Sequence, residues 1–383
     1  MKKIFSAIFT VIALCLFAIP AKTALALGEI QVSSKSAYLM DFNSGTVIYS
    51  KNSKDRLPIA SMTKIMLLNL CFEKLEEGEY TLDDYITVSE HASGMGGSQV
   101  FLESNKDYKA GELIKSIIVA SANDASVAMA ERLYGSEDVC VEEMNNKCNE
   151  WGLGNTLFSN CTGLPKPTQY SCAEDVAKML GKLLTHKDYF TYSGIWIDEI
   201  EHEGGRVTGI NNTNKLIRFY DGCDGGKTGY TTESGFCLAA TAKRGAMRLI
   251  SVVINAPDSK TRFAEVSNML NYGFDNYTAK MVVDAKKPLD ISVTVEKGIK
   301  DSVQVIPQRD LFVFAERNSK AKIDIDFKPY GVKAPIKKGE AVGELIVYID
   351  NVEYAKVPAV AAEDVDKKTY FDYIKGVAED WII

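Results

Sequence analysis

Histidine is scarce in this chain: among its 383 residues, only His91, His186 and His202 are histidines. The eight cysteines never form a Cys-x-x-Cys pair, so the usual sequence signature of a cysteine metal site is missing. Three scattered histidines also give no support for a Ser-His-Asp triad. We therefore expect the protein to use neither a metal ion nor a cofactor.

Basic residues are outnumbered by acidic ones. The chain has 44 lysines and arginines against 51 aspartates and glutamates, a formal net charge of −7. Proteins bind nucleic acids through clustered lysines and arginines that contact the phosphates. We therefore expect no nucleic-acid partner.

The longest apolar run lies at the N-terminus. Lys2 and Lys3 precede an apolar stretch at residues 4–19, and small residues follow at 24–26. This order is typical of a secretory signal, and the stretch is too short for a convincing membrane span. We expect residues 1–26 to be a signal peptide that is cleaved at its end. The chain is then exported, to the extracytoplasmic face of the cell membrane or the periplasm.

Removal of residues 1–26 also removes one cysteine, Cys15. Cys15 follows Leu14 rather than a small residue, so we do not expect lipidation. Without residues 1–26, the chain has 41 basic and 51 acidic residues, a net charge of −10, and seven cysteines. An odd count leaves at least one thiol unpaired in an exported protein. We interpret the cysteines as small buried side chains.

About 357 residues remain, which is enough for two domains. Residues 37–50 have the pattern of a hairpin, and three successive strands with a closing helix are expected at 225–255 and 261–274. The helices expected between them begin at Ser61 or span 112–119, 124–134 and 173–184. We predict an α+β domain at residues 27–278, in which both ends share one antiparallel sheet flanked by helices.

Beyond residue 278 the pattern becomes β-rich. Residues 289–295 alternate with a period of two, and Asp350-Asn351 is a hairpin signal between two further apolar runs. We predict a small β-sandwich at residues 279–366. Residues 367–383 place apolar side chains near one helical face, which favours an amphipathic helix that anchors the protein on a membrane surface. The alternative is a terminal helix packed on the protein itself.

Ser61-Met62-Thr63-Lys64 is the first motif whose residue types could carry out catalysis. The three-residue spacing at a helix start places the hydroxyl and the amine on one face. A serine is a weak nucleophile until a base takes its proton, and a lysine can act as that base if burial lowers its pKa. Alone the pattern is weak, since an ordinary helix cap with a solvated lysine has the same letters.

Two further motifs follow in order. Ser121-Ala122-Asn123 interrupts two apolar helices, where it could face a cleft or simply form a capping turn. Lys227-Thr228-Gly229 lies on an expected strand with glycines on both sides. Glycines weaken a strand unless a ligand or another backbone must approach closely. A cation, a hydroxyl and bare backbone suit a carboxylate, although a tight turn with an exposed lysine is the alternative.

Taken together, the three motifs resemble the set of the penicillin-binding proteins and related β-lactamases. The chain is similar to the D-alanyl-D-alanine carboxypeptidases among the low-molecular-mass members. The similarity also includes segments outside the motifs, at residues 96–103, 158–171, 230–237 and 335–340. It implies a β-lactamase/DD-peptidase-like fold, a peptidoglycan pentapeptide as substrate, and β-lactams as inhibitors.

The resemblance also implies a role for each motif residue. Ser61 is expected to be the acylated nucleophile and Lys64 its general base. Ser121 is expected to relay a proton to the leaving amine, and Asn123 to hold the substrate amide and Lys64.

The strand motif is expected to bind the substrate. Lys227 would attract its terminal carboxylate and keep Lys64 neutral by repulsion, assisted by Thr228, with Gly229 beside them. The backbone N–H groups of Ser61 and Tyr230 would form the oxyanion hole. Family members often have His where Tyr230 stands, which bears on substrate preference.

Three other functions are compatible with the same sequence motifs. A β-lactamase on the same fold would need a deacylating base, for which Glu142 has a suitable spacing but a solvated, charge-rich neighbourhood. A module that only binds wall peptides would not need all six polar motif residues. A transpeptidase would use the same motifs with an amine acceptor in place of water.

Overall fold

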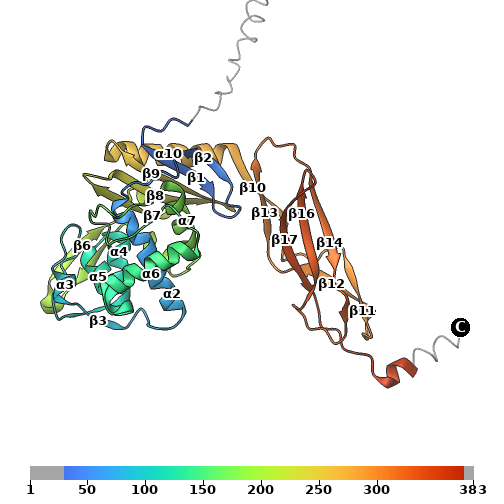
Figure 1. The fold of residues 1–383 in the computed structure, drawn as a ribbon. Coiled ribbons are helices and arrows are strands. Elements are labelled where there is room, and N and C mark those ends of the chain that lie inside the picture. Colours follow the sequence, from blue (N-terminus) through green and yellow to red (C-terminus); the bar gives the residue numbers. More distant parts are fainter. Residues whose placement is uncertain (1–29, 375–383) are drawn as a thin grey trace, which may run out of the picture.

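The computed structural model describes residues 30–374, so the expected signal peptide and most of the expected C-terminal helix lie outside the described residues. Two regions follow one another along the chain (Figure 1). We call them the N-terminal region, residues 36–276, and the C-terminal region, residues 277–361. Within residues 30–374, no helix is both long and apolar enough to cross a membrane.

The N-terminal region is built on one antiparallel sheet of five strands in the order β2-β1-β9-β8-β7. Its two ends thus share a sheet, as the sequence predicts. The strands are β1 (Ser36–Asp41), β2 (Val47–Lys51), β7 (Cys223–Thr231), β8 (Gly235–Arg244) and β9 (Met247–Ala256). Strand β7 lies at the edge of the sheet, which leaves one side of its backbone without a neighbouring strand.

Side chains alternate between the two faces of this sheet. Leu39 and Leu238 pack with helix α10 (Ser259–Asn276), whereas Tyr38 and Ala239, their neighbours along the chain, pack with the other helices. Successive residues of a strand point to opposite faces, so one strand contributes to two cores. The sheet therefore separates α10 from the main helical layer, as Figure 1 shows.

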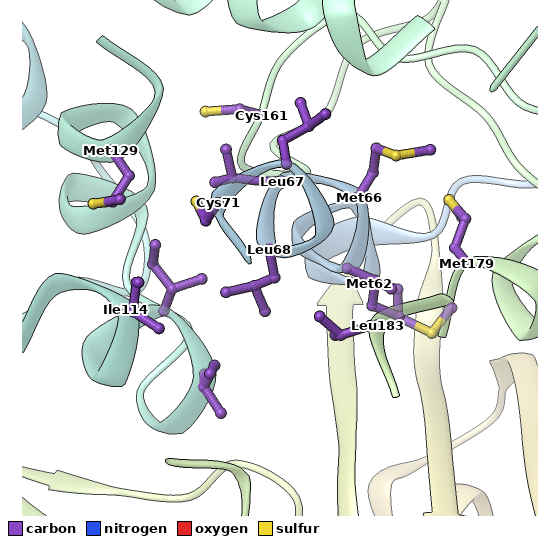
Figure 2. Packing of buried hydrophobic residues seen from close by; sticks show 14 of the residues in the cluster. Met62, Met66, Leu67, Leu68, Cys71, Ile114, Met129, Cys161, Met179 and Leu183 are labelled. Carbon is purple, nitrogen blue, oxygen red and sulfur yellow. The ribbon is translucent and has the colours of Figure 1, made fainter. Parts of the chain in front are cut away.

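The main helical layer surrounds α2 (Lys64–Glu76). Nine consecutive residues of α2, from Lys64 to Phe72, are buried, as expected for a helix that is apolar on nearly every side. Figure 2 shows its side chains packed against residues of neighbouring helices, such as Ile114 and Met129. The longer helices of this layer are α4 (Ala110–Val119), α5 (Asn123–Tyr134), α6 (Glu137–Glu150) and α7 (Ala173–Leu183).

Short elements complete the N-terminal region. They are η1 (Ala60–Thr63), β3 (Tyr85–Thr87), α3 (Glu90–Ser93), β4 (Asp107–Lys109), α8 (Tyr189–Ser193), β5 (Ile197–Glu201), η2 (Glu203–Gly205), β6 (Val207–Asn211) and α9 (Leu216–Phe219).

One predicted helix start is wrong in detail. Helix α5 begins at Asn123, and Asp124 is not its cap. The buried Asp124 carboxylate instead accepts hydrogen bonds from the backbone N–H groups of Val100 and Leu102. The acid therefore fixes a neighbouring loop rather than the end of its own helix.

The C-terminal region has two sheets that share one core. Its core includes Val283 and Val313 from the smaller sheet and Val305 and Val347 from the larger one. The pair β10-β13 forms the first sheet, and the order β14-β16-β17-β12-β11-β15 forms the second. The strands are β10 (Tyr277–Val283), β11 (Ser292–Glu296), β12 (Ser302–Pro307), β13 (Leu311–Glu316), β14 (Ile323–Pro329), β15 (Val332–Lys333), β16 (Ala341–Ile349) and β17 (Val352–Ala361).

The predicted hairpin at Asp350-Asn351 is confirmed. Ile349 pairs with Val352, and both turn residues have positive φ angles, 48° and 66°. A two-residue turn with two positive φ angles matches the twist of the flanking strands, and Asn and Asp tolerate that conformation best after Gly.

The seven cysteines within residues 30–374 are free and buried. All lie at or before position 237, so the C-terminal region contains none. Their interpretation as small buried side chains is confirmed.

Candidate active site

Ser61 and Lys64 lie together where η1 meets α2. The Lys64 amine is fully buried, and its Nζ lies 3.1 Å from Ser61 Oγ. The same Nζ contacts Asn123 Oδ1 at 2.7 Å and the Thr162 carbonyl oxygen at 2.5 Å. Three oxygens thus fix the position of the amine, and one of them belongs to the candidate nucleophile.

Burial changes the protonation of Lys64. It lowers the pKa of the amine to about 7, and nearby Cys161 and Asp124 partly oppose this shift. Desolvation disfavours the charged form of a lysine because the ammonium loses its hydration. A large fraction of Lys64 is therefore an uncharged amine near neutral pH, with a lone pair that can accept the Ser61 proton.

Lys227 is the second buried amine of the site. Its side chain is 2% exposed, and burial, followed by the charges of Lys64 and Arg262, holds its pKa well below the usual value. Its Nζ donates to the Thr228 carbonyl at 3.2 Å, and no salt bridge involves it within residues 30–374. A ligand carboxylate would supply the missing countercharge.

Of the two expected causes of the lowered Lys64 pKa, one is confirmed and one is not. Burial is the largest cause, as expected, whereas Lys227 is not among the causes for Lys64. The charge of Lys64 does lower the pKa of Lys227, after burial, so Lys227 is not a permanent cation.

Strand β7 lies directly against the segment that precedes Ser61. Gly229 is so close that an added Cβ would lie 2.6 Å from the Ile59 carbonyl oxygen and 3.2 Å from the Ser61 nitrogen. Only glycine allows this approach, which explains a glycine in the middle of a strand. Thr228 is buried on the same strand, whereas Tyr230 is 56% exposed and its ring lies at a tilt against that of Phe236.

The Ser121 turn faces the site from the helical side. Ser121 has a φ of 63°, a left-handed conformation that is costly for a residue with a side chain and recurs at functional sites as well as in turns. Asn123 donates from Nδ2 to the Gly96 carbonyl at 2.7 Å while its Oδ1 accepts from Lys64. The turn therefore ties the loop that begins at Gly96 to Lys64.

Two functional contacts were missed by the sequence analysis. Arg262 on α10 is 9% exposed, and its Nη1 donates to the carbonyls of Gly229 (3.1 Å) and Cys237 (3.2 Å). Its Nε has no hydrogen-bond partner in the part of the chain that the structure describes. Arg262 shares a helical face with the buried Val266 and Met269, so a charge on an apolar face was the available signal.

The other missed contact is made by the loop before residue 164. The Thr162 carbonyl holds Lys64, and Gly163 has a φ of 85° with its Cα against Ala60. An added Cβ at Gly163 would lie 2.1 Å from the Ala60 carbonyl oxygen. No sequence pattern marks a carbonyl as a lysine partner, because every residue has one.

Glu142, the possible deacylating base, is exposed on α6. The described residues also contain no group of three His, Cys, Asp or Glu side chains placed to hold a metal ion.

Comparisons with known proteins agree with this arrangement. The family profile described as D-alanyl-D-alanine carboxypeptidase matches residues 21–258, and that of the penicillin-binding protein 5 C-terminal domain matches residues 275–367. The chain is 39% identical to the D-alanyl-D-alanine carboxypeptidase DacF of Bacillus subtilis, over 92% of this chain and 91% of DacF. It is 30% identical to DacA of Escherichia coli K12, over 92% and 90%.

Solved structures show the same similarity. Penicillin-binding protein 5 from Haemophilus influenzae has a TM-score of 0.71 at 29% identity, over 89% of this chain and 99% of that one. PBP3 from Streptococcus pneumoniae, described as a peptidoglycan synthesis regulatory factor, has a TM-score of 0.76 at 25% identity, over 88% and 100%.

Proposed function

The chain belongs to the D-alanyl-D-alanine carboxypeptidase family, and we propose that Ser61 is the serine through which it removes the terminal D-alanine of peptidoglycan peptides. The observation that carries this assignment is the buried Lys64 amine, with its pKa lowered to about 7, at 3.1 Å from Ser61 Oγ. A base with a pKa near the operating pH combines a large unprotonated fraction with good proton affinity.

Substrate binding starts at the terminal carboxylate. In our proposal this group is received by Lys227 and Thr228 in the middle of β7 and by Arg262, which reaches β7 from α10. Both cations are buried and have lowered pKa values, so a bound anion stabilises their charged forms and gains strong, poorly screened contacts. Asn123, whose Oδ1 accepts from Lys64 and whose Nδ2 donates to the Gly96 carbonyl, is proposed to hold the substrate amide with its remaining hydrogen-bonding capacity.

Acylation follows at the bond between the two D-alanines. Lys64 takes the Ser61 proton as Oγ attacks the carbonyl carbon, and the backbone N–H groups of Ser61 and Tyr230 bind the oxygen that becomes negative. Each such donor typically contributes about 3–4 kcal/mol to the transition state. The proton passes by way of Ser121 to the leaving amine, free D-alanine departs, and water hydrolyses the Ser61 ester. A β-lactam, which these family members typically bind, acylates the same oxygen.

The two regions receive separate roles. We assign catalysis to residues 27–278 and a supporting role to the β-rich domain at 279–366. Residues 1–26 are assigned as the export signal, in keeping with relatives that are extracytoplasmic peptidoglycan enzymes.

The C-terminal segment is proposed to contact a membrane surface. Tyr370 and Phe371 are 76% and 78% exposed, and they begin the stretch at 367–383 that was expected to be amphipathic. A chain that ends at Asp366 should bind anionic lipid vesicles less than the full-length chain in a sedimentation assay. Equal binding of the two would contradict an anchoring role.

The nucleophile assignment is tested with a peptide that ends in D-Ala-D-Ala. We expect the intact protein to release D-alanine, and Ser61→Ala to lower kcat/KM by at least about 10⁴-fold. Ser302→Ala, at an exposed position on β12, is the matched control. Intact-mass spectrometry should show a penicillin adduct on the intact protein and on the control, but not on Ser61→Ala. Release of D-alanine by Ser61→Ala at the intact rate would exclude Ser61.

A further inference from the structure

Two glycines directly before Lys227 have no role in the mechanism above. They are Gly225 and Gly226, in the first half of β7. Gly226 has a φ of 127°, and an added Cβ there would collide with the Ala239 carbonyl oxygen of β8. An added Cβ at Gly225 would lie 2.9 Å from the Tyr189 hydroxyl oxygen. The two glycines therefore allow this part of β7 to approach both β8 and the Tyr189 side chain closely.

Tyr189 makes a specific contact with this segment. Its hydroxyl oxygen accepts a hydrogen bond from the Gly226 N–H at 2.9 Å, and the residue is 1% exposed. Gly226 is joined directly to Lys227, so this bond fixes the main chain one residue away from the amine that is proposed to bind the substrate carboxylate. A buried N–H group that loses its acceptor destabilises the conformation in which it is buried. The contact therefore holds the backbone that carries Lys227.

The Tyr189 ring is held in turn by the helical layer. Its centroid lies 6.2 Å from that of Phe72 in an edge-to-face arrangement, and 5.5 Å from that of Phe190. Phe72 belongs to α2, the helix that begins at Lys64. Aromatic rings that are packed in this way have few alternative positions. Tyr189 therefore connects the helix of one buried amine of the site with the strand of the other.

Two further side chains hold Asp224, the residue before the two glycines. Ser193 Oγ, from the same helix α8, donates to the Asp224 carbonyl at 2.5 Å. Arg248 donates to both carboxylate oxygens of Asp224, each at 2.7 Å. Of these contacts, that of Tyr189 is the nearest to Lys227 along the chain. It is therefore the one whose loss should affect Lys227 most directly.

Lys227 depends on its main chain for its position. Within residues 30–374, the one hydrogen bond of its Nζ is to the carbonyl of the adjacent Thr228. A bond to an adjacent residue moves with the strand, so it does not fix the amine relative to Ser61. In the proposed function, on which this inference rests, Lys227 must meet the terminal carboxylate while the scissile bond lies at Ser61. A displacement of the strand would break this match.

We propose that Tyr189 is a positioning residue, whose hydroxyl fixes the Gly226 N–H and thereby holds Lys227 where it meets the terminal carboxylate of the substrate. Tyr189 does not itself contact the substrate. Without the hydroxyl, the strand leaves the binding-competent position in a fraction of the molecules, and the apparent affinity falls with the fraction that remains competent. The chemical step at Ser61 keeps its rate once the substrate is bound.

Removal of one hydroxyl tests the proposal. Tyr189→Phe keeps the ring, and with a peptide that ends in D-Ala-D-Ala its KM should be about fivefold higher or more at unchanged kcat, because the unpaired Gly226 N–H favours the displaced strand. The matched control is Tyr80→Phe, which removes another buried tyrosine hydroxyl, bonded to the Cys71 carbonyl at 2.8 Å. The control should keep its KM within about twofold. Equal KM values for the two variants would overturn the proposal.

A double-mutant cycle shows whether Tyr189 acts through Lys227. Lys227→Met alone should raise KM, and the addition of Tyr189→Phe should raise it no further, because the amine to be positioned is gone. Two residues with independent structural roles would instead give effects that multiply. A full additional rise of KM in the double variant would therefore contradict the positioning role.

A second variant covers the case in which Tyr189→Phe does not fold, as judged by thermal unfolding. Ser193→Ala removes the other bond from α8 to the same segment, at the Asp224 carbonyl. It should also raise KM at unchanged kcat, and an unchanged KM would refute the positioning of the strand by α8.

Lys227→Met separates this inference from the function on which it rests. If this variant raises KM and Tyr189→Phe does not, the carboxylate role of Lys227 stands and the positioning role of Tyr189 is refuted. If Lys227→Met itself leaves KM unchanged, the proposed binding of the carboxylate fails, and the inference fails with it.

Discussion

The two regions of the molecule differ in which side chains they bury. The N-terminal region encloses charged groups that include Lys64, Lys227, Arg262, Asp124 and Glu265. In the described C-terminal region, by contrast, every buried side chain outside glycine and proline is hydrophobic. Burial of a charge is costly unless the group is compensated. The comparison teaches that the region with the candidate site accommodates buried charges, some of them at the site and others, such as Glu265 beside Ser33, compensated by hydrogen bonds elsewhere.

Replacement of a lysine in each region should give the largest contrast. Lys64→Met keeps a side chain of similar length but removes the base, so D-alanine release should fall by about 10²- to 10⁴-fold. Lys320→Met, which removes an exposed amine in the C-terminal region, should change release by less than twofold. Steady-state kinetics with one D-Ala-D-Ala peptide measures both. Full activity of Lys64→Met would contradict the role of the buried Lys64 amine as the base.

The pH dependence of acylation tests the role of the buried Lys64 amine more directly. Only the uncharged Lys64 amine can accept the Ser61 proton, and burial lowers its pKa to about 7. Acylation should therefore slow about tenfold per pH unit well below pH 7 and level off above it. Stopped-flow acylation by a chromogenic β-lactam measures this profile. A flat rate between pH 5 and 7 would exclude Lys64 as the titrating base.

Replacement of two glycines that have nearly the same φ angle should give the next largest effect, a loss of stability that differs between the two sites. Gly163 has a φ of 85° and Gly339 a φ of 87°, but only Gly163 has neighbours within 4 Å of an added Cβ. Gly339→Ala should cost about 1 kcal/mol for the left-handed backbone alone. Gly163→Ala should lower the free energy of unfolding by about 3 kcal/mol or more, because Ala60 must also move. Denaturant unfolding measures both, and equal losses would contradict the close packing at Gly163.

Two buried leucines provide the smallest expected effect on activity. Leu70→Ala in α2 and Leu345→Ala in β16 should each destabilise their own region by about 2–5 kcal/mol through a cavity. At 25 °C, Leu345→Ala should nevertheless leave D-alanine release within twofold, since its core is separate. Calorimetry together with the activity assay tests this. A parallel loss of activity and C-terminal stability would show that the regions unfold as one unit.

Local patterns predicted much of the fold. Alternation located the strands around residues 225–255, and apolar periodicity located α7 and α10. In the C-terminal region the prediction missed β10, β12, β13 and β15. Of these, β12 pairs with the preceding strand β11, whereas β10 pairs with the distant β13. The pairing of β10 with β13 joins segments about 30 residues apart, and short windows contain no information on such contacts.

The candidate site shows the same limit. The motifs identified Ser61, Lys64 and Asn123, which the structure brings into direct contact, and Lys227, whose pKa responds to Lys64. Arg262 was missed because it comes from α10, far from every motif, and reaches β7 only when the sheet forms. Burial was predicted as a cause of the lowered Lys64 pKa, but how completely the amine is buried depends on the assembled helices and could not be read from the motif.

The buried cysteines allow the opening of the N-terminal region to be measured without an added probe. All seven thiols within residues 30–374 are shielded, and none belongs to the C-terminal region. A thiol-alkylating reagent can therefore modify these seven thiols only as fast as the structure that protects them opens. The rate at which they are labelled measures the opening of the N-terminal region and gives no information on the C-terminal region.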